Sequence, residues 1–141
     1  MASEAALRAM VKAQLGPFGS LERVENKCNV GTPDICYALR WRGTTLQGWL
    51  ELKHLAAWPA RPATPTRLGI RPEQLLWAEA WCGTVHLLAQ IGREYLLLPP
   101  GQLRRAHEGL PREELCRVAL VVGQPFPTKA LLEALAKAAA P

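Results

Sequence analysis

An alternating segment near the middle of the chain constrains the fold most strongly. From Leu50 to Lys53 apolar and polar residues alternate, which is the pattern of a strand with one buried face. Residues 35–41 form a second run rich in strand-forming residues, and Arg-Gly-Thr-Thr at 42–45 lies between the two runs as a turn signal. We therefore predict a β-hairpin over residues 34–55 that brings its two ends together.

Three charged residues belong to this hairpin: Asp34 at its start, and Glu51 and Lys53 toward its end. Side chains alternate across a strand, so Glu51 and Lys53 share one face while Leu52 points to the other. Two carboxylates suit Mg²⁺, because hard cations prefer oxygen ligands, and a lysine beside them can handle water or phosphate. The pattern indicates metal-assisted phosphodiester hydrolysis. In a plainer interpretation, Asp34 caps a turn after Pro33, and Glu51 and Lys53 form a solvated stripe.

Three motifs, in the right order, carry a resemblance to a known family. They are Gly31-Thr32-Pro33-Asp34, then Gly48-Trp49-Leu50-Glu51-Leu52-Lys53, then Gln74 in an apolar helix. With these motifs, residues 22–98 resemble the PD-(D/E)XK nuclease superfamily, most closely its small virus-type replication-repair nucleases, which phages often encode. Holliday-junction resolvases are broader relatives.

The resemblance implies an α/β fold with a restriction-endonuclease-like core, in which a central mixed β-sheet is flanked by helices. It implies that Asp34 and Glu51 bind Mg²⁺ or Mn²⁺ with help from the Leu52 backbone carbonyl. Lys53 would position or activate water, and Gln74 would support the site. The implied activity is that of a DNA endonuclease leaving 5′-phosphate ends.

The family also places an upstream acidic residue at the site, contributed by the first helix or strand. Here Glu25 occupies the corresponding place, on a short strand expected over residues 21–25, and would be a further metal or catalytic residue. Glu22 is the weaker alternative. The choice depends on strand register, because a slip of one residue exchanges the two faces.

Composition favours a single domain with a polyanionic partner. The 141 residues, 49% of them hydrophobic, suit one nuclease domain with a core over about 21–98 and an extension over about 99–141. The net charge is +5, and most of the basic residues are arginines, whose side chains can bind phosphate through two hydrogen bonds. Arg61, Arg67 and Arg71 are candidate DNA contacts. A generally basic surface explains any single arginine equally well.

The remaining segments give further expectations. The prolines at 59, 62 and 65 predict a long loop over 56–69, which either contacts DNA or only connects elements. Other expected elements are helices over 4–15, 72–83, 102–107 and from Thr128 onward, strands over 85–91 and 94–98, and a strand or buried segment over 115–122. The tryptophans of the 72–83 helix are expected in the core. The last helix packs on the domain or on a second subunit, which would make a homodimer.

Other function classes are less favoured. Four cysteines without Cys-x-x-Cys spacing, and histidines not beside them, argue against structural zinc. No signal-peptide pattern or membrane-length apolar run occurs, so we expect no membrane partner and a cytoplasmic location in a phage-infected or bacterial cell. A non-catalytic nucleic-acid-binding module and a nuclease acting on RNA remain alternatives to a DNA endonuclease, whose preferred substrate, branched or otherwise, the sequence leaves open.

Overall fold

The computed structural model describes residues 3–25 and 30–139. Within them, five α-helices and six β-strands follow one another in an α/β arrangement. In chain order these are α1 (Glu4–Leu15), β1 (Gly19–Arg23), β2 (Ile35–Trp41), β3 (Thr44–Leu55), α2 (Pro72–Ala80), β4 (Val85–Ile91), β5 (Glu94–Leu98), α3 (Leu103–Glu108), α4 (Arg112–Val118), β6 (Val121–Gly123) and α5 (Thr128–Ala139).

All six strands form one mixed sheet at the centre of the fold, in the order β1-β2-β3-β4-β5-β6. Every neighbouring pair is antiparallel except β3 and β4, which run parallel. A parallel pair needs a crossover connection, and α2 provides it here. The expected mixed sheet with flanking helices is therefore confirmed.

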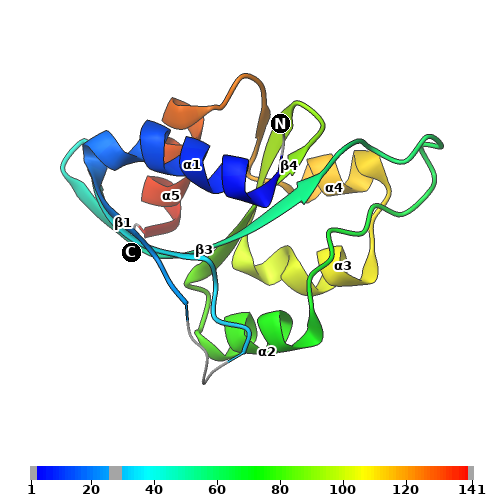
Figure 1. Cartoon of the computed structure of the whole chain (residues 1–141), viewed down its shortest axis with the longest axis horizontal. Helices are drawn as coiled ribbons and strands as arrows, with labels where there is room; N and C mark the ends of the chain where they lie inside the picture. Colours follow the sequence, from blue (N-terminus) through cyan, green and yellow to red (C-terminus); the bar gives the residue numbers. More distant parts are fainter. Residues whose placement is uncertain (1–2, 26–29, 140–141) are drawn as a thin grey trace.

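Helices cover both faces of the sheet (Figure 1). On one face, α1 and α5 pack against leucines of β2 and β3, including the alternate residues Leu50 and Leu52. On the other face, α2, α3 and α4 pack against alternate residues of β4 such as Leu87 and Ala89. Since residues 50–53 of β3 are covered on both sides, the polar residues Glu51 and Lys53 are held inside the protein.

Three predicted elements differ from those observed. The helix expected over 72–83 is α2, which ends at Ala80. β1 spans Gly19–Arg23 and ends two residues earlier than expected, because its ladder with β2 stops where Arg23 pairs with Ile35. The apolar run at 115–122 is divided between the end of α4 and the short strand β6. Two glutamates in the first turn of α4 favour a helix there through the helix dipole.

The loop between β3 and α2 is fastened to the α3–α4 side of the domain. The indole Nε1 of Trp58 donates to Glu94 over 3.0 Å, and Arg112 lies 4.8 Å above the Trp58 ring. Farther along, Thr66 and Leu110 exchange backbone hydrogen bonds of 2.7 and 3.3 Å. The predicted loop is thus present, and these contacts tie it to the core. Among the described residues, none of the helices has both the length and the apolar character of a membrane span.

Candidate active site

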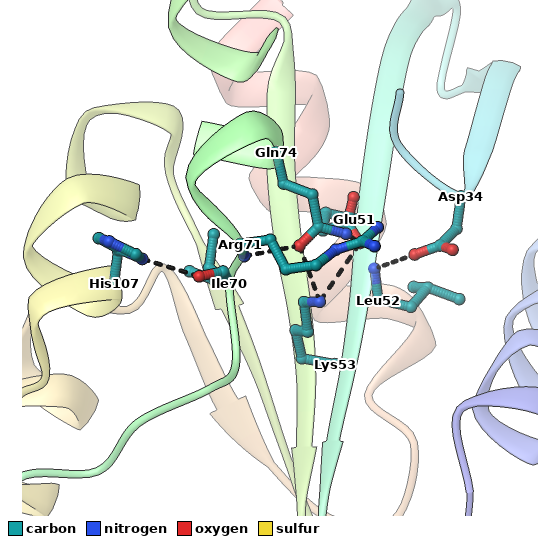
Figure 2. Close-up of polar contacts among 8 residues, drawn as sticks. All are labelled: Asp34, Glu51, Leu52, Lys53, Ile70, Arg71, Gln74 and His107. Atoms are coloured by element: carbon teal, nitrogen blue, oxygen red, sulfur yellow. Dashed lines mark hydrogen bonds and ion pairs between the residues drawn. The ribbon is translucent and has the colours of Figure 1, made fainter. Parts of the chain in front are cut away.

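The difference in length between β2 and β3 creates an open strand edge. Pairing of the two strands stops at Ile35 and Leu50, whereas β3 continues to Leu55 along β4. Asp34, directly before β2, lies at this edge, where its Oδ2 accepts a 2.9 Å hydrogen bond from the Leu52 amide (Figure 2). In a strand, the amide and carbonyl of one residue point to the same side, so the Leu52 carbonyl also faces this edge.

Glu51 and Lys53 both project from β3 toward α2 and are buried inside the protein. Glu51 is 4% exposed and Lys53 is 7% exposed. The Lys53 ammonium lies 3.8 Å from Oε1 of Glu51. Such burial excludes the interpretation of these two residues as a solvated surface stripe. An ion pair inside a protein needs further polar partners to offset its desolvation.

Gln74, in the first turn of α2, supplies those partners. Its Nε2 donates to Oε1 of Glu51, and its Oε1 accepts from Nζ of Lys53, both over 3.0 Å (Figure 2). The same Oε1 accepts a 2.9 Å bond from the backbone amide of Arg71. Both ends of the side-chain amide are therefore engaged, which fixes its orientation and links α2 to β3.

The environment of Glu51 is unfavourable to a bare negative charge. Burial, and then the neighbouring Asp34 carboxyl, raise the pKa of Glu51 from 4.5 to about 9, although the Lys53 charge acts in the opposite direction. A buried carboxyl group held beside a second, partly exposed one forms a donor set that a divalent cation would stabilise. The residues present thus fit Mg²⁺ or Mn²⁺.

Glu4, in the first turn of α1, is a third acidic residue near the pair. Its charge contributes to the raised pKa of Glu51. The sequence prediction missed this residue, although the resemblance allowed an acidic residue from either the first helix or the first strand. The available signal was its position as the first residue of the predicted helix, directly after the Ser3 cap.

Glu25, the upstream acid expected from sequence, does not join Asp34 and Glu51 in this structure. It follows the end of β1, is exposed, and forms a 2.8 Å ion pair with Arg23. The early end of β1 is the physical reason, because Glu25 lies beyond the ladder that would aim it at the site. Glu22 pairs with Cys36 instead and lines a groove farther along the sheet.

Of the three candidate arginines, Arg71 lies at the site. Figure 2 shows its side chain extending across the group formed by Glu51, Lys53 and Gln74. Arg61 and Arg67 are exposed on the loop, and Arg67 directly follows Thr66, which is bonded to the α3–α4 connection. Among the described residues, neither makes a hydrogen bond or ion pair with the site.

Close backbone contact aligns the segment before Asp34 with the start of α2. Gly31 has a φ of +101°, and a Cβ placed on it would lie 2.3 Å from the carbonyl oxygen of Glu73. Only glycine suits both conditions. On the other side of the same helix end, Nδ1 of His107 lies 2.8 Å from the Ile70 carbonyl oxygen (Figure 2). The residues before α2 are thus held from both sides.

The donor set is small within residues 3–25 and 30–139. No three Asp, Glu, His or Cys side chains in these ranges form a complete metal-binding group. A cation here would be held by Asp34, Glu51 and the Leu52 carbonyl, with water completing its shell. The interpretation depends on this arrangement of residues, since comparisons with protein-family models, curated proteins and solved structures find no match to the chain.

Proposed function

We propose that this protein is a metal-dependent nuclease of the PD-(D/E)XK type that hydrolyses phosphodiester bonds in DNA. The observation that carries the proposal is the buried Glu51 carboxyl, held by Lys53 and Gln74 on one side and facing Asp34 at an open strand edge. A protein seldom buries a carboxyl group and an ammonium beside a second carboxyl group unless they serve a purpose at that place.

In this proposal Asp34, Glu51 and the Leu52 carbonyl hold Mg²⁺ or Mn²⁺. The bound ion would lower the pKa of water and neutralise charge that develops on the phosphate. Asp34 is already oriented by the Leu52 amide, so little side-chain ordering accompanies binding. Glu4 adds negative charge near the same place and strengthens the attraction for a cation.

Lys53 orients the attacking water or a phosphate oxygen. Its ammonium has three donors, and the structure gives it Gln74 as an acceptor and Glu51 as an ionic partner, both on the α2 side. Gln74 acts as a positioning residue, because it holds Glu51 and Lys53 at a fixed separation. Arg71, beside the group, would bind a neighbouring phosphate of the substrate.

A cleavage assay tests the proposal. Supercoiled plasmid, a linear duplex, a synthetic four-way junction and an RNA with the sequence of the duplex are each incubated with purified protein in Mg²⁺, in Mn²⁺ and in EDTA. Wild type is expected to cut DNA only with metal, and Asp34→Asn and Lys53→Ala should cut at least 100-fold more slowly, about the loss seen when one transition-state contact is removed. Glu79→Gln, which alters an exposed carboxylate paired with Arg104, is the matched control.

The substrates separate the rival functions. Cutting of the RNA but not of the DNA would show that the same metal site acts on RNA. Binding of DNA without metal-dependent cutting, unchanged in the Asp34 and Lys53 variants, would show a non-catalytic binding module. Equal cutting by wild type and both variants would mean that the reaction occurs elsewhere. Preference for the junction over linear duplex would indicate structure-selective cleavage.

A further inference from the structure

We infer that the groove beside α2 holds an unstacked base of the nucleic-acid strand that is cut, with Trp81 as its stacking surface. This inference rests on the proposed nuclease function and deepens it, because it specifies a substrate with at least one unpaired base. The supporting observations are a groove on the sheet, a rigid exposed indole, a position near the carboxylate pair, and the chemistry of the lining.

The groove exists because α2 covers only part of its face of the sheet. The small side chains of Cys36 and Ala38 on β2 lie opposite Trp49 and Gln47 of β3 and form its floor. Trp81 and Thr84, from the end of α2 and the turn after it, form a wall. The hollow measures about 490 Å³, which is within the range of small-molecule sites.

The indole of Trp81 is an exposed aromatic surface whose orientation is fixed by neighbouring rings. It is 47% exposed, although the other tryptophan of α2, Trp77, is buried. The two rings stack with centroids 4.7 Å apart and planes inclined by 11°, and the Trp49 ring meets Trp81 edge-on at 5.7 Å. The Thr84 hydroxyl donates a 2.8 Å bond to the Trp81 carbonyl. Because the indole is ordered by its neighbours, stacking a base on it costs little conformational entropy.

The groove continues directly from the carboxylate pair. Cys36 and Trp49 are each two residues along their strands from Asp34 and Glu51, and side chains two residues apart share a face. Two residues of a strand span about 7 Å. A nucleic-acid strand with one phosphate at Asp34 and Glu51 can therefore place the adjacent base over Trp81.

The lining suits a base and disfavours a phosphate. Glu22 is the charged residue among the side chains that line the groove, and it would repel a phosphate. Its carboxylate can instead accept from a base amino group, and Gln47 and Thr84 can bond to base edges. Arg71, the arginine proposed to bind phosphate, bonds to Gln74 through its backbone amide and is not among the residues that line the groove. In a continuous duplex the bases are stacked within the helix, so a single strand or an unpaired flap fits this surface.

The test compares two oligomers that have the same number of phosphates. A 5′-labelled twelve-residue oligodeoxythymidylate and an abasic oligomer of equal length are titrated with full-length protein in EDTA, and binding is followed by fluorescence anisotropy. Wild type should bind the thymidylate about tenfold more tightly than the abasic oligomer. Trp81→Ala should abolish that preference, and Trp81→Phe should keep most of it.

Leu76→Ala is the matched control, because Leu76 is an exposed apolar residue of the same helix and does not line the groove. Equal affinity of wild type for the two oligomers would overturn the inference. A preference for the thymidylate that is as large in Trp81→Ala as in Leu76→Ala would also overturn it. Binding in EDTA does not depend on cleavage, so a protein that shows the Trp81-dependent preference but never cuts would refute the nuclease proposal alone.

Discussion

Oδ2 of Asp34 accepts a 2.9 Å hydrogen bond from the backbone amide of Leu52, which fastens the segment before β2 to the strand that carries Glu51. The two carboxyl groups are thereby held together before any ion arrives. Removing one of the two carboxyl groups should therefore remove most of the affinity for a divalent cation.

We expect Mg²⁺ or Mn²⁺ at about ten times its dissociation constant to raise the Tm of wild type by about 4 °C, and Asp34→Asn to lose this increase. Differential scanning fluorimetry with a metal titration measures it. Glu79→Gln should behave as wild type, since its carboxylate is exposed and pairs with Arg104. A metal-dependent rise of the same size in Asp34→Asn would place the ion elsewhere.

The raised pKa of Glu51 predicts a pH-dependent stability of the metal-free protein. The folded state keeps a proton on Glu51 up to about pH 9, whereas the unfolded chain releases it near 4.5. This contribution is complete below the unfolded pKa and is lost as the pH rises through the folded one. We expect the Tm in EDTA to fall over this window and Glu51→Gln to flatten the fall. Metal affinity should increase over the same window, because binding requires the ionised carboxylate.

Replacing Gln74 should weaken both the fold and the site. Gln74→Leu removes the acceptor of Lys53 and the donor to Glu51, and leaves two buried polar groups with fewer partners. We expect a loss of about 1–3 kcal/mol in the free energy of unfolding, measured by urea denaturation. Gln74→Glu keeps the shape but adds a third carboxylate, and should raise the pKa of Glu51 further. A Gln74→Leu variant as stable as wild type would show that this network contributes little.

A methyl group at Gly31 should disturb the site from a distance. Gly31→Ala combines a positive φ with a clash against the Glu73 carbonyl, so we expect a cost of about 2 kcal/mol or more. Gly43→Ala is the control, because Gly43 also has a positive φ, of +78°, but has open space around its Cβ position. It should lose only about 1 kcal/mol. Equal losses would mean that the segment before Asp34 adapts without strain.

The burial of His86 predicts that acid lowers the stability of the protein, which is opposite to the pH response predicted for Glu51. Both ring nitrogens are buried without a hydrogen-bond partner among the described residues, and burial lowers the pKa of His86 to about 4. A depressed folded pKa means that stability is present above the unfolded value of 6.5 and is lost as the pH falls toward 4. The loss at pH 4 should be on the order of 2–3 kcal/mol. His86→Leu should remove it in acid denaturation followed by circular dichroism. An unchanged acid transition would assign the loss to other groups.

Much of the site is predictable because its signals are local. The alternation from Leu50 to Lys53 fixes which residues of β3 share a face, and the turn at 42–45 fixes the hairpin that brings Asp34 to Glu51. Gln74 follows a proline that suits the first turn of a helix. The structure brings Asp34, Glu51 and Gln74 together with Lys53.

The remainder depends on contacts that no short segment encodes. Glu4 approaches Glu51 only because α1 packs across the sheet, and Glu25 is directed away because the pairing of β1 with β2 ends at Arg23. Trp81 was expected in the core with Trp77, yet α2 ends at Ala80 and leaves the Trp81 indole half exposed. These three outcomes depend on where helices and strands pack and end, which is set by the neighbouring parts of the fold.

The start of α2 has a consequence for how the site assembles. Oε1 of Gln74 accepts from the Arg71 amide at the helix start and from Lys53 in the sheet. A helix that began one residue earlier or later would turn this side chain by about 100°, away from β3. The residue at which α2 starts therefore also decides whether Gln74 reaches Lys53 and Glu51, so the helix start and the polar network are one structural requirement.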